Sequence, residues 1–124
     1  MACTKARLTP SMEGKYIVLS KASSTTIYEG SLVAVNSSGQ AIPAAKAASQ
    51  PAVGMAYEVD GNTVKVERGV HLWDNDATGA VTAANIGGTC YIVDDCTVTS
   101  TSTGSSSAGK VLGLEGDQVI VETL

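Results

Sequence analysis

The stretch GMAYEVDGNTVKVE (residues 54–67) returns near the end of the chain as GKVLGLEGDQVIVE (residues 109–122), and the two align without a gap. In each copy a glycine opens an alternating apolar segment, a Gly-Asn or Gly-Asp pair follows, and Val-x-Val-Glu closes the unit. Gly-Asn and Gly-Asp pairs between alternating apolar residues are typical of tight β-hairpin turns. Each copy therefore predicts a β-hairpin.

A weaker likeness lies upstream of each hairpin, where residues 30–36 resemble residues 88–94 once a three-residue gap is allowed. The repeat copies then span about 30–67 and 88–122. An internal duplication explains this pattern, and so does independent use of the same turn residues in two hairpins. Either explanation indicates a β scaffold built from similar halves.

Short strands are also expected around these hairpins, bounded by Gly, Asn, Asp, Ser and Pro. They are predicted at 16–19, 31–35, 40–43, 70–73, 90–93 and 97–99. About ten short strands at intervals of eight to twelve residues are typical of a sandwich or barrel. We expect an all-β fold with one domain at 15–124, an internal pseudo-repeat, and an extended N-terminal arm at 1–14.

The composition limits the kinds of partner. The 124 residues include no Phe and one Trp, and the net charge is −4. Small apolar side chains bury little area each, so the isolated protomer should be modestly stable and should gain from association. An acidic chain with few scattered cations is not expected to bind nucleic acid. No stretch resembles a membrane span or a secretion signal, and three cysteines fit a reducing cytosol.

Cys90, Asp94, Asp95 and Cys96 bear some likeness to a metal cluster. The C-x5-C spacing lacks the second ligand pair that zinc clamps use. If Asp94 and Asp95 form a two-residue turn, Val93 faces Cys96 and Cys90 faces Thr99, so the two cysteines are not cross-strand partners. We therefore expect no metal or other cofactor, and two buried thiols that act as small apolar residues.

His71 and Trp73 lie on one face of a predicted strand. A catalytic base needs a nucleophile and an orienting acid beside it, and the sequence supplies no such set for His71. Trp73 fits the core by residue type, although Trp is also enriched at interfaces. We keep Trp73 and His71 as oligomer-interface candidates and predict no catalytic residue.

Two further motifs are incomplete. Asp74, Asn75 and Asp76 resemble the start of an EF-hand loop, but the required Gly and the terminal Glu are missing. Gly87 and Gly88 are not followed by the Lys-Ser/Thr of a phosphate-binding loop. A polar turn is favoured over a weak surface calcium site for the first stretch, and the two glycines are not expected to bind phosphate.

The C-terminal part of the chain contains GTCYIVDD (88–95), a variable Ser/Thr loop, AGKVL (108–112) and VIV (119–121), in that order. With these motifs the chain resembles, over about residues 27–124, the decoration, or cement, proteins of tailed-bacteriophage heads. This resemblance implies a structural virion protein that binds outside the expanded capsid as a trimer or dimer and reinforces contacts between major capsid subunits. It also implies assembly in the host bacterial cytoplasm and no enzymatic activity.

On this hypothesis the arm extends over a neighbouring subunit and adds a strand to its sheet edge. The capsid-contact candidates are Cys3, Lys5, Arg7, Leu8, Pro10 and Met12. The alternatives are a carbohydrate-binding or adhesin-like β module, although one Trp and four Tyr offer few stacking platforms, and another virion component such as a head fibre base. Whether the Ser/Thr loop at 99–108 faces the capsid or solvent is left open.

Overall fold

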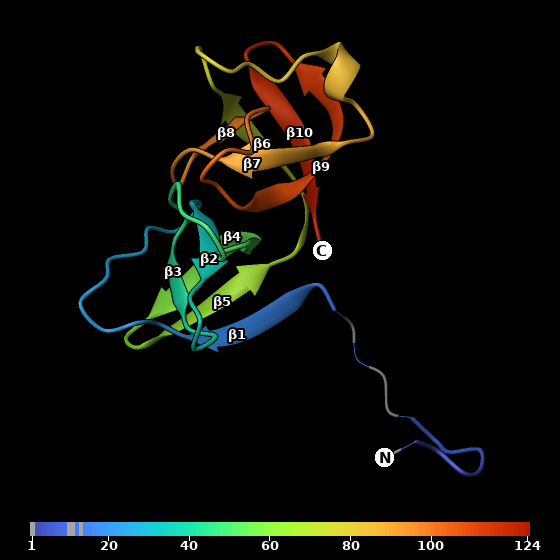
Figure 1. Ribbon diagram of the computed structural model, residues 1–124. Coiled ribbons are helices and arrows are strands. Elements are labelled where there is room, and N and C mark those ends of the chain that lie inside the picture. Colours follow the sequence, from blue (N-terminus) through green and yellow to red (C-terminus); the bar gives the residue numbers. More distant parts are fainter. Residues whose placement is uncertain (1, 10–11, 13) are drawn as a thin grey trace.

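The computed structural model describes residues 2–9, 12 and 14–124, and shows a small all-β domain with two sheets (Figure 1). Its described part contains ten strands and one short 3-10 helix, η1 (Ala83–Asn85). The strands are β1 (Tyr16–Ser20), β2 (Leu32–Val35), β3 (Ala41–Pro43), β4 (Ala52–Asp60), β5 (Thr63–Glu67), β6 (Gly69–Asn75), β7 (Thr89–Ile92), β8 (Thr97–Thr99), β9 (Ser107–Glu115) and β10 (Gln118–Thr123). The all-β prediction is confirmed.

The first five strands form one sheet and the last five form a closed barrel. The sheet order is β1-β5-β4-β2-β3, and around the barrel it is β6-β10-β9-β7-β8. Each strand of the first half thus has a counterpart five strands later, in the same position. Arg68 alone joins β5 to β6, and so joins the two halves.

The two halves also share their closing contacts. In the barrel, β6 runs parallel to β8, with Asn75 opposite Val98. In the first sheet a single parallel bridge joins Lys21 to Ala41 at the corresponding place. The first sheet therefore curves toward a barrel, and a single bridge links the end of β1 to β3 at its two edges.

Two glycines in each half explain why the hairpins resemble each other. Gly61 and Gly116 have φ values of 59° and 58°, which their turns require and which glycine adopts without steric strain. Gly54 and Gly109 have φ values of 150° and 154°. A Cβ at these two positions would lie 2.5 Å and 2.4 Å from the carbonyl oxygens of Glu67 and Glu122. The backbones therefore approach where only glycine fits.

The irregularities of the ladders recur as well. Tyr57 and Leu112 are each the extra residue of a β-bulge, one in the β4–β5 ladder and the other in the β9–β10 ladder. A second register shift follows Val33 in the β2–β4 ladder and Cys90 in the β7–β9 ladder. Val33 lies opposite Gly54, and Cys90 lies opposite Gly109. This register pairs Val33 with Cys90, one residue away from the sequence alignment, which had paired Val33 with Tyr91. The matching geometry extends to β1 and β6, beyond the predicted repeat copies.

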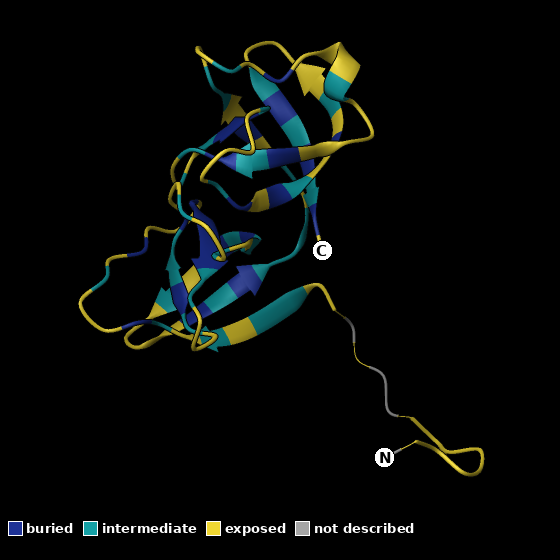
Figure 2. Cartoon of the chain, in the orientation of Figure 1, coloured by how far each residue is buried: buried dark blue, intermediate teal, exposed yellow. Residues whose placement is uncertain are grey.

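The core consists of two clusters of buried apolar residues, small and medium in size except for Trp73, and buried residues occur in both halves (Figure 2). One lies inside the first sheet and contains Val33, Val64 and Val66. The other fills the barrel and continues into the contact with the first sheet, through residues such as Leu32 and Ala34. Valines at alternating positions of the hairpins supply much of both clusters, as strand periodicity requires.

Two local predictions were wrong. The turn between β7 and β8 is longer than two residues, because the Val93 N–H donates to the Thr97 carbonyl and Tyr91 lies opposite Thr99. Cys90 therefore faces Gly109 of β9 rather than Thr99 across the β7–β8 hairpin. The prediction that Cys96 is a buried thiol was also wrong, because Cys96 is exposed.

Among the described residues, no helix is long and apolar enough to cross a membrane.

Candidate interaction surfaces

The N-terminal arm is exposed over all of its described residues. Residues 2–9 and 12 are open to solvent, and the described part runs away from the body (Figure 1). Leu8 is 98% exposed, so an apolar side chain lies in solvent beside the cations Lys5 and Arg7. Cys3 and Met12 are exposed too, whereas Pro10 lies outside the described residues. The described capsid-contact candidates are thus available to a partner.

His71 and Trp73 lie side by side on the inward face of β6. Trp73 is 4% exposed and belongs to the barrel core, and its ring centroid lies 6.1 Å from that of His71. His71 Nε2 lies 2.9 Å from Glu67 Oε1, and this hydrogen bond is the main reason why the pKa of Glu67 is lowered. Little of either ring is left for an oligomer interface, and the structure gives both a packing role.

Several hydroxyl groups in the described chain hold the backbone in place. Those of Thr99, Ser105, Ser106 and Thr123 donate to backbone carbonyl oxygens, as do those of several loop residues. Such bonds satisfy loop and strand-end carbonyls that would otherwise lack a donor. Ser106 also accepts a hydrogen bond from the Gln50 N–H, and so ties the loop between β3 and β4 to the barrel.

The acidic turn before β8 brings three donor atoms together. Ligand atoms of Asp94, Asp95 and Cys96 lie within 4.8 Å of one another, while Cys90 is buried elsewhere. Burial raises the pKa of the Cys90 thiol to about 11, so it stays protonated at neutral pH. Asp94 accepts hydrogen bonds from the backbone N–H and the thiol of Cys96. The carboxylate thus organises the turn itself.

The EF-hand-like trio is likewise used by its own loop. Asn75 bonds both backbone groups of Val81 through its side-chain amide. Asp76 accepts from the N–H groups of Thr78 and Gly79, and the first of these bonds is the main cause of its lowered pKa. These contacts hold the loop between β6 and η1 in one conformation.

An aromatic and cationic cluster covers the exposed face of β1, β5 and β4, and sequence reasoning missed it. The rings of Tyr16 and Tyr57 lie 5.0 Å apart, and Lys65 Nζ lies 4.8 Å and 5.7 Å from their centroids. Lys15 Nζ lies 5.4 Å from the Tyr16 ring. The β4 bulge places Tyr57 here, and no sequence signal fixed its position.

The corresponding face of the barrel is aliphatic. The positions of Tyr16, Val18, Tyr57 and Lys65 are taken there by Val70, Leu72, Leu112 and Ile120, which we call the aliphatic face. Val70 is 50% exposed, and Leu72 and Leu112 are each 41% exposed. Exposed apolar residues gathered on one face are typical of interaction sites.

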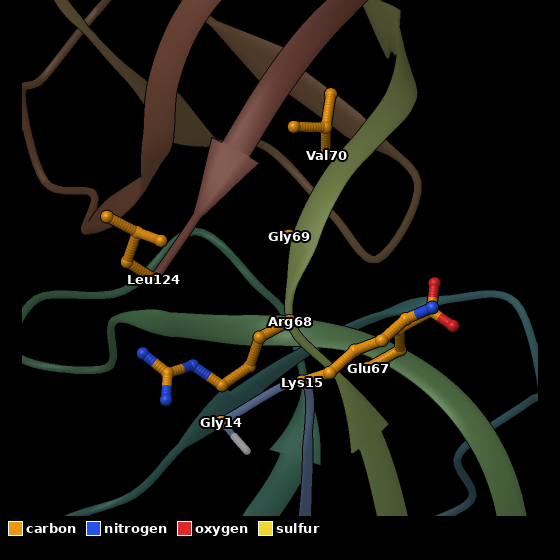
Figure 3. A pocket seen from close by; sticks show the side chains of 7 residues that line it. All are labelled: Gly14, Lys15, Glu67, Arg68, Gly69, Val70 and Leu124. Carbon is orange, nitrogen blue, oxygen red and sulfur yellow. The ribbon is translucent and has the colours of Figure 1, made fainter.

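A groove of about 630 Å³ separates the two faces at the joint between the halves (Figure 3). Gly14, Lys15, Glu67, Arg68, Gly69, Val70 and Leu124 line it. Arg68 extends to the Leu124 side, while Lys15 and Glu67 point the other way (Figure 3). The arm therefore leaves the body at a hollow that also holds the last residue of the chain.

Comparisons with known proteins gave no match to a family model, to a curated protein or to a solved structure.

Proposed function

We propose that this chain is a structural virion protein that binds the outside of an expanded phage capsid and reinforces contacts between major capsid subunits. The observation that carries the proposal is the exposed N-terminal arm on a body built of hydrogen-bonded β-strands. Its support from sequence is the resemblance of residues 27–124 to head decoration proteins. On this proposal the protein has no catalytic role and belongs to the capsid exterior.

The groove at the joint supports a direction for this binding. Because Gly14 and Leu124 line the same hollow, the start of the arm and the end of β10 lie on one side of the body. We propose that this side faces the shell. An extended arm gains affinity by adding a strand to a partner's sheet, since its backbone groups are then paired.

Co-sedimentation with expanded, undecorated heads tests the proposal. Such heads would be assembled from the major capsid protein of the phage that, on this proposal, encodes the chain. We expect saturable binding at a fixed number of copies per capsid subunit, and loss of binding when residues 2–13 are removed from an otherwise folded protein. Full binding by the truncated protein would show that the arm does not make the capsid contact. No binding by the intact protein would refute the proposal as a whole.

A glycan-binding role is the second candidate, because Tyr28 and Tyr57 present exposed rings. Aromatic faces are the usual platforms for sugars, yet Lys65 already lies near the Tyr57 ring. A glycan array tests this role. Binding of a specific saccharide by the wild-type chain, and loss of that binding in a Tyr28→Ala and Tyr57→Ala variant, would favour it.

A further inference from the structure

The charges of the molecule are unevenly divided. Residues 69–124 contain seven carboxylates and one lysine, a net charge of −6. Residues 2–9 of the arm contain Lys5 and Arg7 and no carboxylate, a net charge of +2, and Glu13 is the one carboxylate in the sequence of the arm. Oppositely charged surfaces attract at long range and select partners. The arm and the barrel of this chain are therefore electrostatically complementary.

The aliphatic face offers the arm an apolar surface as well. Leu72 of β6 lies opposite Ile120 of β10, which faces Gly113 of β9, so this row has a low, apolar centre. The next row toward the β9–β10 turn is Asp74, Gln118 and Glu115. An extended segment with an apolar side chain beside two cations matches this arrangement. Leu8 would lie on the apolar row, and Lys5 and Arg7 near the acidic one.

The matching face of the first half is a poor site for the same segment. Lys65 stands where the barrel has Ile120, and Lys15 lies beside it over the Tyr16 ring. Two lysines there would repel Lys5 and Arg7. The repeated backbone thus presents two equivalent faces, and the charges favour only the barrel face.

We propose that, in the free protein, residues 2–9 of one copy bind across the aliphatic face of a second copy. The arm of the described chain runs away from its own barrel, and its residues are exposed (Figure 1). A neighbouring barrel is therefore the partner, and the contact joins two different surfaces. Such a heterologous contact produces rings or open chains. The proposal does not depend on capsid binding.

Sedimentation equilibrium of the purified full chain, without heads, tests this contact. We expect self-association that weakens at high salt, because exposed charges are screened. Reversing the arm with Lys5→Glu and Arg7→Glu should weaken association about tenfold or more, and so should reversing the acidic row with Asp74→Lys and Glu115→Lys. Both pairs of changes in one chain should restore association.

A control pair makes the same change of net charge on the equivalent hairpin of the first half. Glu58→Lys and Asp60→Lys should leave the association constant within about twofold of wild type, because these carboxylates lie outside the proposed contact. A twofold change corresponds to about 0.4 kcal/mol. A chain that stays monomeric at every concentration, or that associates equally without residues 2–9, overturns the proposal. So does equal weakening by the control pair.

Photo-crosslinking locates the contact. A photoreactive residue in place of Leu8, with ¹⁴N- and ¹⁵N-labelled copies mixed, should give crosslinks between differently labelled chains at residues 69–75 or 109–122. Crosslinks within one chain, or to the first half, overturn the proposal. Because heads are absent, a failure here leaves the capsid proposal untouched, and a failure to bind heads leaves this one untouched.

Discussion

Replacing Gly109 with alanine tests whether the close approach of β9 and β10 determines the fold. The new Cβ would lie 2.4 Å from the Glu122 carbonyl oxygen and 2.8 Å from Val121 Cγ1. The oxygen belongs to backbone, so β10 must move. Strain at φ 154° contributes about 1–3 kcal/mol and the displaced packing about 1–3 kcal/mol more. We expect a loss of about 4 kcal/mol in the free energy of unfolding.

Urea unfolding followed by circular dichroism and by Trp73 fluorescence measures this loss. The same change at Gly54 should have a similar effect, because its Cβ would lie 2.5 Å from the Glu67 oxygen. Gly116→Ala, at φ 58° with nothing within 4 Å, should lose only about 1–2 kcal/mol. Gly113→Ala, whose Cβ meets only Ile120 Cδ1 at 3.4 Å, is the control. If Gly109→Ala loses no more than Gly116→Ala, the steric argument is refuted.

Three further predictions concern pH, thiols and the loop after β6. Folding lowers the pKa of Glu67, so the stability that this carboxylate contributes is complete above its unfolded pKa of 4.5 and is lost as the pH falls through its folded pKa. Glu67→Gln should therefore flatten the pH dependence of the urea midpoint below about 4.5, and an unchanged profile would contradict this. With a thiol reagent, the exposed Cys3 and Cys96 should react in the folded protein and the buried Cys90 only after unfolding; three fast thiols would contradict the burial. Gly79→Ala would place a Cβ 2.7 Å from Thr101 Oγ1 and 2.8 Å from Thr99 Oγ1, so we expect a loss of about 1–3 kcal/mol in the free energy of unfolding, and a smaller loss would show that these hydroxyls rotate away.

The hairpins were predictable because their information is local. The hairpin at 54–67 was predicted correctly, since a turn glycine and alternating valines mark where its two strands meet. The parallel pairing of β6 with β8 was not predictable, because it joins distant segments without a turn between them. Its counterpart, the bridge from Lys21 to Ala41, has the same origin.

The surfaces were less predictable than the strands. A bulge shifts which side chains share a face, so Tyr57 joined Tyr16 and Lys65 without any periodic signal. The exposed Cys96 was missed because the turn was taken as two residues long. The arm at 1–14 stays a prediction that rests on the absence of a strand pattern, and its described residues are exposed.

The repeated hairpin shows how little sequence this backbone demands. Its two versions agree at five of fourteen aligned positions: Gly54 with Gly109, Gly61 with Gly116, Val64 with Val119, Val66 with Val121 and Glu67 with Glu122. Two of the five pairs are glycines with positive φ, of which Gly54 and Gly109 also leave no room for a Cβ, and two other pairs are valines that fill the cores. A distant relative would therefore be recognised by the pattern Gly-x6-Gly-x2-Val-x-Val-Glu, occurring twice, rather than by overall identity.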